Sequence, residues 1–186
     1  MNYEGQIALV TGATRGIGAA IAQTLGAGGA TVIGTATSDS GAEKISAALA
    51  NANIKGCGLK LDVTDQAAVE AALAHIEKEY GTVGILVNNA GITRDTLLLR
   101  MKEEDWQAIL DTNLTSVFRL SQAVLKGMMK ARKGRIISIA SVVGAMGNAG
   151  QTNYAAAKAG LIGFSKSLAR EVGPRAVSYT HLTLPT

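Results

Sequence analysis

The stretch Ile7-Ala-Leu-Val-Thr-Gly-Ala-Thr-Arg-Gly-Ile-Gly18 joins a short apolar run to a turn that contains three glycines. An Ala-rich segment, residues 17–28, follows the turn, and the glycines at 28 and 29 are a helix stop. In such an order of strand, turn and helix, backbone amides can approach a pyrophosphate. The spacing is G-x-x-x-G-x-G and not the G-x-G-x-x-G dinucleotide fingerprint, so the turn alone is also compatible with a tight turn that binds nothing.

Strand-like and helix-like segments alternate along the rest of the chain. Strands are expected at residues 7–11, 31–35, 58–61, 85–88 and 135–139. Helices are expected at residues 17–28, 42–50 and 65–80, after Asn113, and around residues 154–158. Alternation of this kind predicts βαβ crossovers and a parallel sheet covered on both faces. The sequence therefore predicts one α/β domain over residues 1–176, a doubly wound, Rossmann-like parallel sheet.

Composition excludes several classes of protein. Hydrophobic residues make up 47% of the 186 residues and charged residues 17%, which is typical of a globular chain. No apolar run is long enough to cross a membrane, and no signal peptide is visible. The single cysteine, Cys57, allows no internal disulfide, which fits a cytoplasmic protein. No cluster of Cys and His indicates a metal site.

The end of the second predicted strand bears on the choice of cofactor. An acid at this point binds the ribose 2′-hydroxyl of NAD, whereas a nearby cation suits the 2′-phosphate of NADP. Here the chain reads Thr35-Ala-Thr-Ser38, and Arg15 lies within the glycine turn. This pattern favours NADPH. Asp39 is the alternative, because a shifted register would bring its carboxylate closer.

Tyr154 and Lys158 are four residues apart, with only alanines between them. On a helix they share one face. A tyrosine is a poor acid near neutral pH, and a neighbouring ammonium is expected to lower its pKa. The alternative is an amphipathic helix with a buried Tyr and a Lys whose head group reaches solvent.

The chain resembles the short-chain dehydrogenase/reductase family through five features that occur in family order. They are the glycine turn at residues 11–18, Asn88-Asn-Ala-Gly91, Asn113, Ser141 and the pair Tyr154 and Lys158. The resemblance implies that Tyr154 donates a proton to a carbonyl oxygen and that Ser141 hydrogen-bonds the same oxygen. It also implies that Lys158 binds the nicotinamide ribose, and that Asn113 holds a water that leads protons to Lys158.

The resemblance also implies a set of cofactor contacts. They comprise the glycine turn, the end of the second strand and residues after the third and fourth strands: Gly12, Ala13, Thr14, Arg15, Gly16, Ile17, Gly18, Thr37, Asp62, Val63, Asn89, Tyr154 and Lys158. Several of these have simpler interpretations. Ser141 and Asp62 could be caps, Asn113 could begin a helix, and Asn89 could form a turn.

Residues 88–102 and 153–171 are similar to those of family members that reduce 3-oxoacyl groups on acyl carrier protein with NADPH. Such carriers are acidic, so Arg132, in a basic run at residues 126–135, and Arg175 are candidate carrier contacts. The basic run could equally be a solvated helix end. No aromatic residues interleave with it, which argues against nucleic acid. An acetoacetyl-CoA reductase, another ketone reductase, or a dinucleotide-binding protein without activity remain alternatives.

Two further expectations concern assembly and the C-terminal residues. Apolar side chains on the helix after Asn113 and on the helix of Tyr154 predict a homo-oligomer: Leu114, Phe118, Met128, Met129, Leu161, Phe164 and Leu168. Residues 177–186 resemble no part of the family, and they resemble a translated sequencing adapter. We expect this tail to be non-native and the last strands of the sheet to be missing. The strand at 136–139 would then be an exposed edge and the chain inactive, although the β-prone Val177, Tyr179 and Leu182 could still form a short strand.

Overall fold

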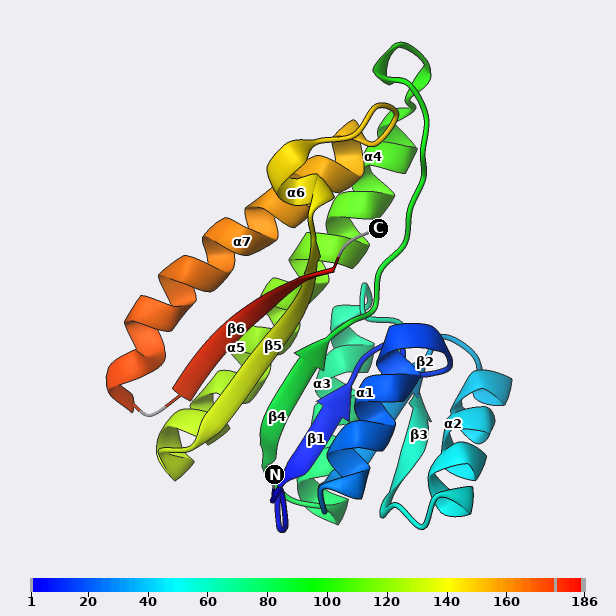
Figure 1. Ribbon diagram of the computed structural model, residues 1–186. Helices are drawn as coiled ribbons and strands as arrows, with labels where there is room; N and C mark the ends of the chain where they lie inside the picture. Colours follow the sequence, from blue (N-terminus) through cyan, green and yellow to red (C-terminus); the bar gives the residue numbers. More distant parts are fainter. Residues whose placement is uncertain (1, 176, 185–186) are drawn as a thin grey trace.

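The computed structural model describes residues 2–175 and 177–184, apart from the side chains of Arg175, Thr183 and Leu184. Its centre is one sheet in the order β3-β2-β1-β4-β5-β6, in which every neighbouring pair is parallel (Figure 1). The strands are β1 (Ile7–Val10), β2 (Thr31–Ala36), β3 (Gly56–Lys60), β4 (Val83–Asn88), β5 (Gly134–Ser141) and β6 (Val177–Leu184). The predicted fold class, a doubly wound parallel sheet in a single domain, is confirmed.

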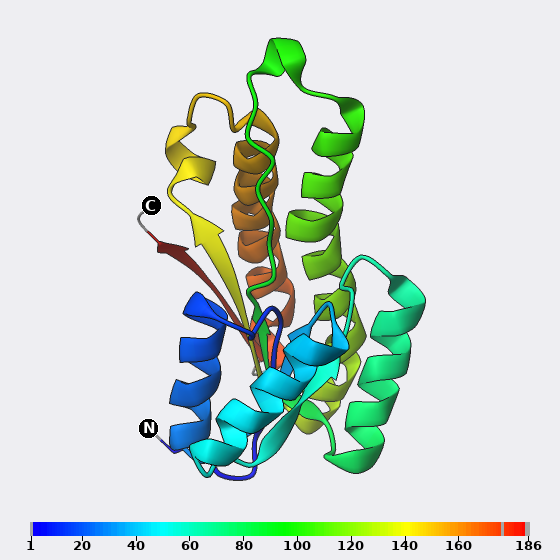
Figure 2. The ribbon, with the colours of Figure 1, turned by 90° about the vertical axis from the view of Figure 1, so that its right-hand side faces the viewer.

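Helices cover both faces of the sheet. They are α1 (Gly16–Ala27), α2 (Asp39–Asn51), α3 (Gln66–Glu79), α4 (Glu103–Leu110), α5 (Ser116–Ala131), α6 (Val143–Met146) and α7 (Thr152–Val172), with short turns η1 (Leu98–Arg100) and η3 (Gly173–Arg175) and a π-helical turn η2 (Asp111–Thr115). Figure 2 shows α1 on one side of the sheet and α3 and α5 on the other.

Alternate residues of β1 pack in two separate cores, one on each face of the sheet. Leu9 of β1 packs with residues of α3, α5 and α7, whereas Ala8 and Val10 pack with residues of α1 and α2. All three are fully buried. Because successive side chains of a strand point to opposite faces, a strand covered on both faces must be apolar throughout, as β1 is.

α2 and α3 each begin after a residue whose side chain is a typical N-cap. Ser38 precedes α2, and its Oγ accepts a hydrogen bond from the amide of Gly41 at 3.1 Å. Asp65 precedes α3 and accepts in the same way from Ala68 at 3.0 Å. These N-caps use backbone donors that would otherwise lack a partner, and they fix the loops that run from the carboxyl ends of β2 and β3.

The expectation of an exposed edge at residues 136–139 is wrong. β6 runs beside β5 over its full length, and Gly134 pairs with Val177 at one end and Ser141 with Leu184 at the other. The β-prone residues of this segment explain the difference, because Tyr179 packs against the core of the α7 face, where its ring meets Phe164 edge-on at 5.9 Å. On this side, the sheet formed by the described residues therefore ends at β6 and not at β5.

Asn113 does not begin a helix. It lies in η2, in the middle of one continuous helical segment, residues 103–131, so the N-cap interpretation is wrong. Its side chain pairs with the backbone of Ile92: Oδ1 accepts from the amide at 2.9 Å and Nδ2 donates to the carbonyl at 2.8 Å. The π-helical turn coincides with this pairing, and such turns are frequent at functional sites.

Candidate active site

The glycine turn connects the carboxyl end of β1 to α1. Gly12 and Gly16 have φ values of +66° and +57°, which favour glycine. A Cβ on Gly12 would lie 3.0 Å from Cα of Ala90, and a Cβ on Gly18 would collide with the carbonyl oxygen of Gly12. α1 begins without a side-chain cap, so its first amides remain available to a ligand. These residues fit the pyrophosphate of a dinucleotide.

Asn89 ties the glycine turn to the end of β4. Its Nδ2 donates to the carbonyls of Thr11 at 2.9 Å and Gly12 at 3.0 Å, and Thr11 Oγ1 accepts from the amides of Asn89 and Ala90, both at 3.0 Å. Both amide hydrogens of Asn89 are therefore used within the protein. Only its Oδ1 is left to accept a hydrogen bond from a ligand.

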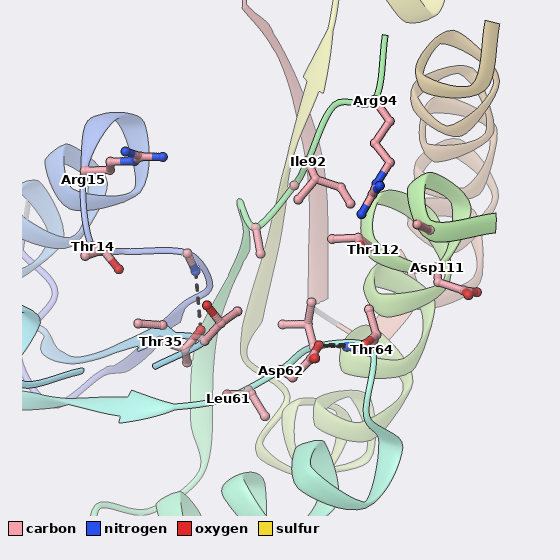
Figure 3. A pocket seen from close by; sticks show the side chains of 17 residues that line it. Thr14, Arg15, Thr35, Leu61, Asp62, Thr64, Ile92, Arg94, Asp111 and Thr112 are labelled. Carbon is pink, nitrogen blue, oxygen red and sulfur yellow. Dashed lines mark hydrogen bonds between the residues drawn. The ribbon is translucent and has the colours of Figure 1, made fainter. Parts of the chain in front are cut away.

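A cavity of about 580 Å³ extends from the glycine turn across the carboxyl ends of β2 and β3. Figure 3 shows Thr14 and Arg15 on one side and Arg94, Asp111 and Thr112 on the other. The predicted cofactor residues that line it are Gly12, Thr14, Arg15, Thr37, Asp62 and Val63. Ala13 is buried in the core beside α1, and Gly16 and Gly18 shape the turn without lining the cavity.

Asp62 orders its own loop and also lines the cavity. Its Oδ1 accepts from the amide and the hydroxyl of Thr64 at 2.9 and 2.7 Å (Figure 3), so it organises the loop after β3. It also lines the cavity, next to Leu61 and Val63. Asp39 does not line this cavity. It forms an ion pair with Lys60, Nζ to Oδ2 2.8 Å.

A second cavity, of about 560 Å³, adjoins the first, since both are lined by Arg15, Gly91 and Ile92. Ser141 at the end of β5 lines it together with Tyr154 and Lys158 of α7. Nζ of Lys158 lies 5.6 Å from the centre of the Tyr154 ring, as expected for residues one helical turn apart. Hence the structure brings three of the four predicted catalytic side chains to one cavity, beside the cavity of the glycine turn.

The fourth predicted catalytic residue, Asn113, does not line this cavity and is linked to it through Ile92. Each polar atom of its side chain makes one hydrogen bond, and both bonds go to the backbone of Ile92. Ile92 itself lines both cavities. We therefore describe Asn113 as a positioning residue, which fixes the loop after β4 through Ile92.

Burial shifts the pKa values of both Tyr154 and Lys158. Lys158 is only 6% exposed, and the loss of solvent lowers its pKa from 10.5 to about 8, while its Nζ donates to the carbonyl of Ile139 at 2.6 Å. Burial likewise raises the pKa of Tyr154, against a lowering by the hydrogen bond with Ser141, and the carboxylate of Asp95 raises it further. The expected lowering of the Tyr154 pKa by Lys158 is therefore wrong for this arrangement, because desolvation outweighs it and the ammonium turns to Ile139.

The sequence did not predict the loop that closes one side of the catalytic cavity. Gln151 Nε2 donates to Asp95 Oδ2 at 2.9 Å, the buried Asn153 donates to the carbonyl of Arg94 at 3.1 Å, and the amide of Thr96 donates to Gly150. These contacts hold the loop after β4 against the N-terminus of α7, which carries Tyr154. The acidic run at the start of α4, residues 103–105, was the sequence signal that could have placed the end of this loop.

Arg132, one of the two residues predicted to contact a carrier, lies away from this cavity. Arg132 ends α5, with φ +49°, and it is exposed beside the start of β5, whereas Ser141 lies at the other end of that strand (Figure 1). The structure does not bring Arg132 to the catalytic cavity. The side chain of Arg175 lies outside the described residues. In the described part of the chain, no group of three or more His, Cys, Asp or Glu could hold a metal ion.

The family model for short chain dehydrogenases matches residues 6–185. The chain belongs to the short-chain dehydrogenase family. This family consists of oxidoreductases that use a nicotinamide dinucleotide. The two adjoining cavities are therefore the candidate cofactor and catalytic sites.

The chain is also similar to individual curated members of the short-chain dehydrogenase family. It is 67% identical over 178 residues to the 3-oxoacyl-[acyl-carrier-protein] reductase FabG of Escherichia coli K12. The corresponding enzymes of Vibrio cholerae and Pseudomonas aeruginosa are 65% and 63% identical. Each alignment covers 96% of this chain and 72% of the relative.

Proposed function

We propose that the gene product reduces 3-oxoacyl-[acyl-carrier-protein] to the 3-hydroxy form with NADPH, in the cytoplasm, as a step of fatty acid biosynthesis. The convergence of Ser141, Tyr154 and Lys158 on one cavity beside the glycine turn carries this proposal. The relatives with 63–67% identity support the substrate class.

The side chains suit the reduction of a ketone. When bound, a reduced nicotinamide would supply the hydride that the carbonyl carbon accepts. The hydroxyls of Ser141 and Tyr154 face the oxygen, where negative charge develops, and Tyr154 transfers its proton to that oxygen. The carbonyl thus gains one hydride and one proton and becomes an alcohol. Lys158 lies one helical turn from Tyr154 and lines the same cavity, where it would bind the nicotinamide ribose.

Substrate preference separates this proposal from its alternatives. The gene product should oxidise NADPH faster with a carrier-linked 3-oxoacyl group than with the same group linked to CoA, measured as kcat/KM. A clear preference for the CoA thioester would instead favour an acetoacetyl-CoA reductase. Binding of NADPH with no oxidation by any 3-ketoacyl thioester would indicate a dinucleotide-binding protein without activity.

We expect NADPH to be preferred to NADH, because Arg15 and Thr37 both line the cavity, whereas the first carboxylate after β2, Asp39, does not line it. Arg15→Ala should lower kcat/KM for NADPH roughly tenfold and leave that for NADH nearly unchanged, since a charge-assisted hydrogen bond contributes ~1.5–3 kcal/mol. Steady-state kinetics with both cofactors check this. Equal use of the two cofactors by the unmodified protein would contradict the assignment.

The basic run suits the acidic surface of a carrier protein rather than the acyl group itself. Lys126, Lys130, Arg132, Lys133 and Arg135 are all exposed. Arg132 and Lys133 directly precede β5, and Ser141 lies at the far end of this eight-residue strand, which spans roughly 26 Å at the usual rise of a strand.

Arg132→Glu should therefore raise KM for the carrier-linked substrate about tenfold, because it replaces attraction by repulsion. It should leave KM for a small 3-oxoacyl thioester unchanged. Lys55→Glu, at an exposed lysine outside this run, is the matched control. An equal rise in KM for both substrates would indicate that the basic run is only a solvated surface.

We propose that the gene product is a homo-oligomer, but the surface that supports this is smaller than the sequence indicated. Met128, Leu161 and Leu168 are buried in the cores, and Phe118 on α5 is the one exposed member of the predicted set, at 46%. Phe118→Glu should shift the protein to monomers in sedimentation velocity. A monomeric unmodified protein at micromolar concentration would overturn the proposal.

A further inference from the structure

Asp39 is the first carboxylate after β2, two residues beyond Thr37, which lines the cofactor cavity. The charge of the side chain at this position affects which cofactor binds. A carboxylate there repels the 2′-phosphate of NADPH and can accept a hydrogen bond from the 2′-hydroxyl of NADH. A protein that uses NADPH must therefore keep this carboxylate away or neutralise it.

The backbone around Asp39 is fixed from two sides. Ser38 caps α2 through the amide of Gly41, and the last residue of β2, Ala36, pairs in register with Lys60 at the end of β3. Leu61, the residue after Lys60, lines the cofactor cavity. Asp39 and Lys60 therefore project from two backbone segments that each continue directly into the wall of the cavity.

The Asp39 side chain is 76% exposed, so packing does not hold it. Its carboxylate is held by Lys60, whose Nζ donates to Oδ2 at 2.8 Å, and this hydrogen bond keeps the pKa of Asp39 below its usual value. The pair lies at a separate shallow depression, which is lined by α2 and β3 and not by the cofactor loops. The ion pair thus sets where the carboxylate points and compensates its charge.

We propose that Lys60 is a specificity-determining residue for the cofactor: by pairing with Asp39 it keeps that carboxylate from the subsite for the 2′-phosphate. Lys60 would then favour the phosphorylated cofactor without contacting it. The inference rests on the proposed use of NADPH. An exposed ion pair has a small effect, so a two- to fivefold change in affinity is expected.

The test compares the binding of 2′,5′-ADP and 5′-ADP, which differ at the 2′ position, by calorimetry at low salt, where exposed charges are least screened. Lys60→Gln should weaken 2′,5′-ADP two- to fivefold and leave 5′-ADP equal or tighter. Asp39→Asn should change neither, because its charge is already compensated. The double variant Lys60→Gln/Asp39→Asn should bind both ligands like the unmodified protein. Lys44→Gln removes an exposed lysine from α2 and should have no effect.

Three results would overturn the inference. The first is a double variant that binds 2′,5′-ADP as weakly as Lys60→Gln, since Lys60 would then act as a phosphate contact or through net charge alone. The second is an equal loss for Lys44→Gln. The third is an unchanged affinity in Lys60→Gln. If the unmodified protein does not prefer 2′,5′-ADP at all, the proposed use of NADPH fails, and this inference fails with it.

Discussion

Tyr154→Phe in the gene product is expected to lower kcat for ketone reduction by at least about a hundredfold, the lower end of what general acid catalysis contributes. The phenol, which lines the cavity together with Ser141, is the proposed proton donor, and Phe keeps the ring but removes the proton. Because the ring and Lys158 remain, the affinity for NADPH should change less than threefold.

The experiment separates chemistry from binding by measuring both quantities on one preparation. Turnover is followed by NADPH absorbance, and affinity is followed by NADPH fluorescence. Tyr80→Phe is the matched control, because the Tyr80 hydroxyl donates to Cys57 on β3, away from the cavity. Turnover by Tyr154→Phe above a tenth of the unmodified rate would show that Tyr154 is not the acid.

Lys158→Met is expected to abolish reduction and yet to stabilise the fold at neutral pH. Lys158 has its pKa lowered from 10.5 to about 8 by burial. Below pH 8 the folded protein carries a buried ammonium that the unfolded chain exposes, which costs about 3 kcal/mol. Between pH 8 and 10.5 the unfolded chain binds more protons than the folded one, so stability rises with pH.

The expected gain is smaller than the full cost of burial. Met also removes the hydrogen bond to the Ile139 carbonyl, which costs about 1 kcal/mol. We therefore expect Lys158→Met to raise the free energy of unfolding by roughly 1–2 kcal/mol at pH 7, and by progressively less as the pH rises toward 10. Urea unfolding at both pH values measures this, with the exposed Lys166→Met as control. A gain that does not depend on pH would rule out the titration of Lys158 as its source.

The layout of the sheet and much of the site could be predicted from local patterns. The strands and helices that carry Ser141, Tyr154 and Lys158 are marked by apolar runs and by residues four apart, which depend only on nearby residues. The glycines of the first turn indicated a close approach of backbone segments, and Gly12 and Gly18 show it.

The features that the sequence did not predict depend on long-range contacts. The hydrogen bonds between Asn113 and Ile92 join residues that are 21 apart in the sequence, and the hydrogen bond from Gln151 to Asp95 joins residues that are 56 apart. The pKa of Tyr154 depends on burial, which only the packed structure shows. The separation of Arg132 from Ser141 follows from the direction of β5, because one end of a strand cannot reach the cavity at its other end.

The most direct test of this account is NADPH oxidation by the gene product with a 3-oxoacyl-[acyl-carrier-protein] substrate. We predict steady oxidation that yields one 3-hydroxyacyl product for each NADPH consumed, with a lower kcat/KM for NADH and for the CoA-linked substrate. A protein that binds NADPH but leaves the carrier-linked 3-oxoacyl group unreduced would contradict the account.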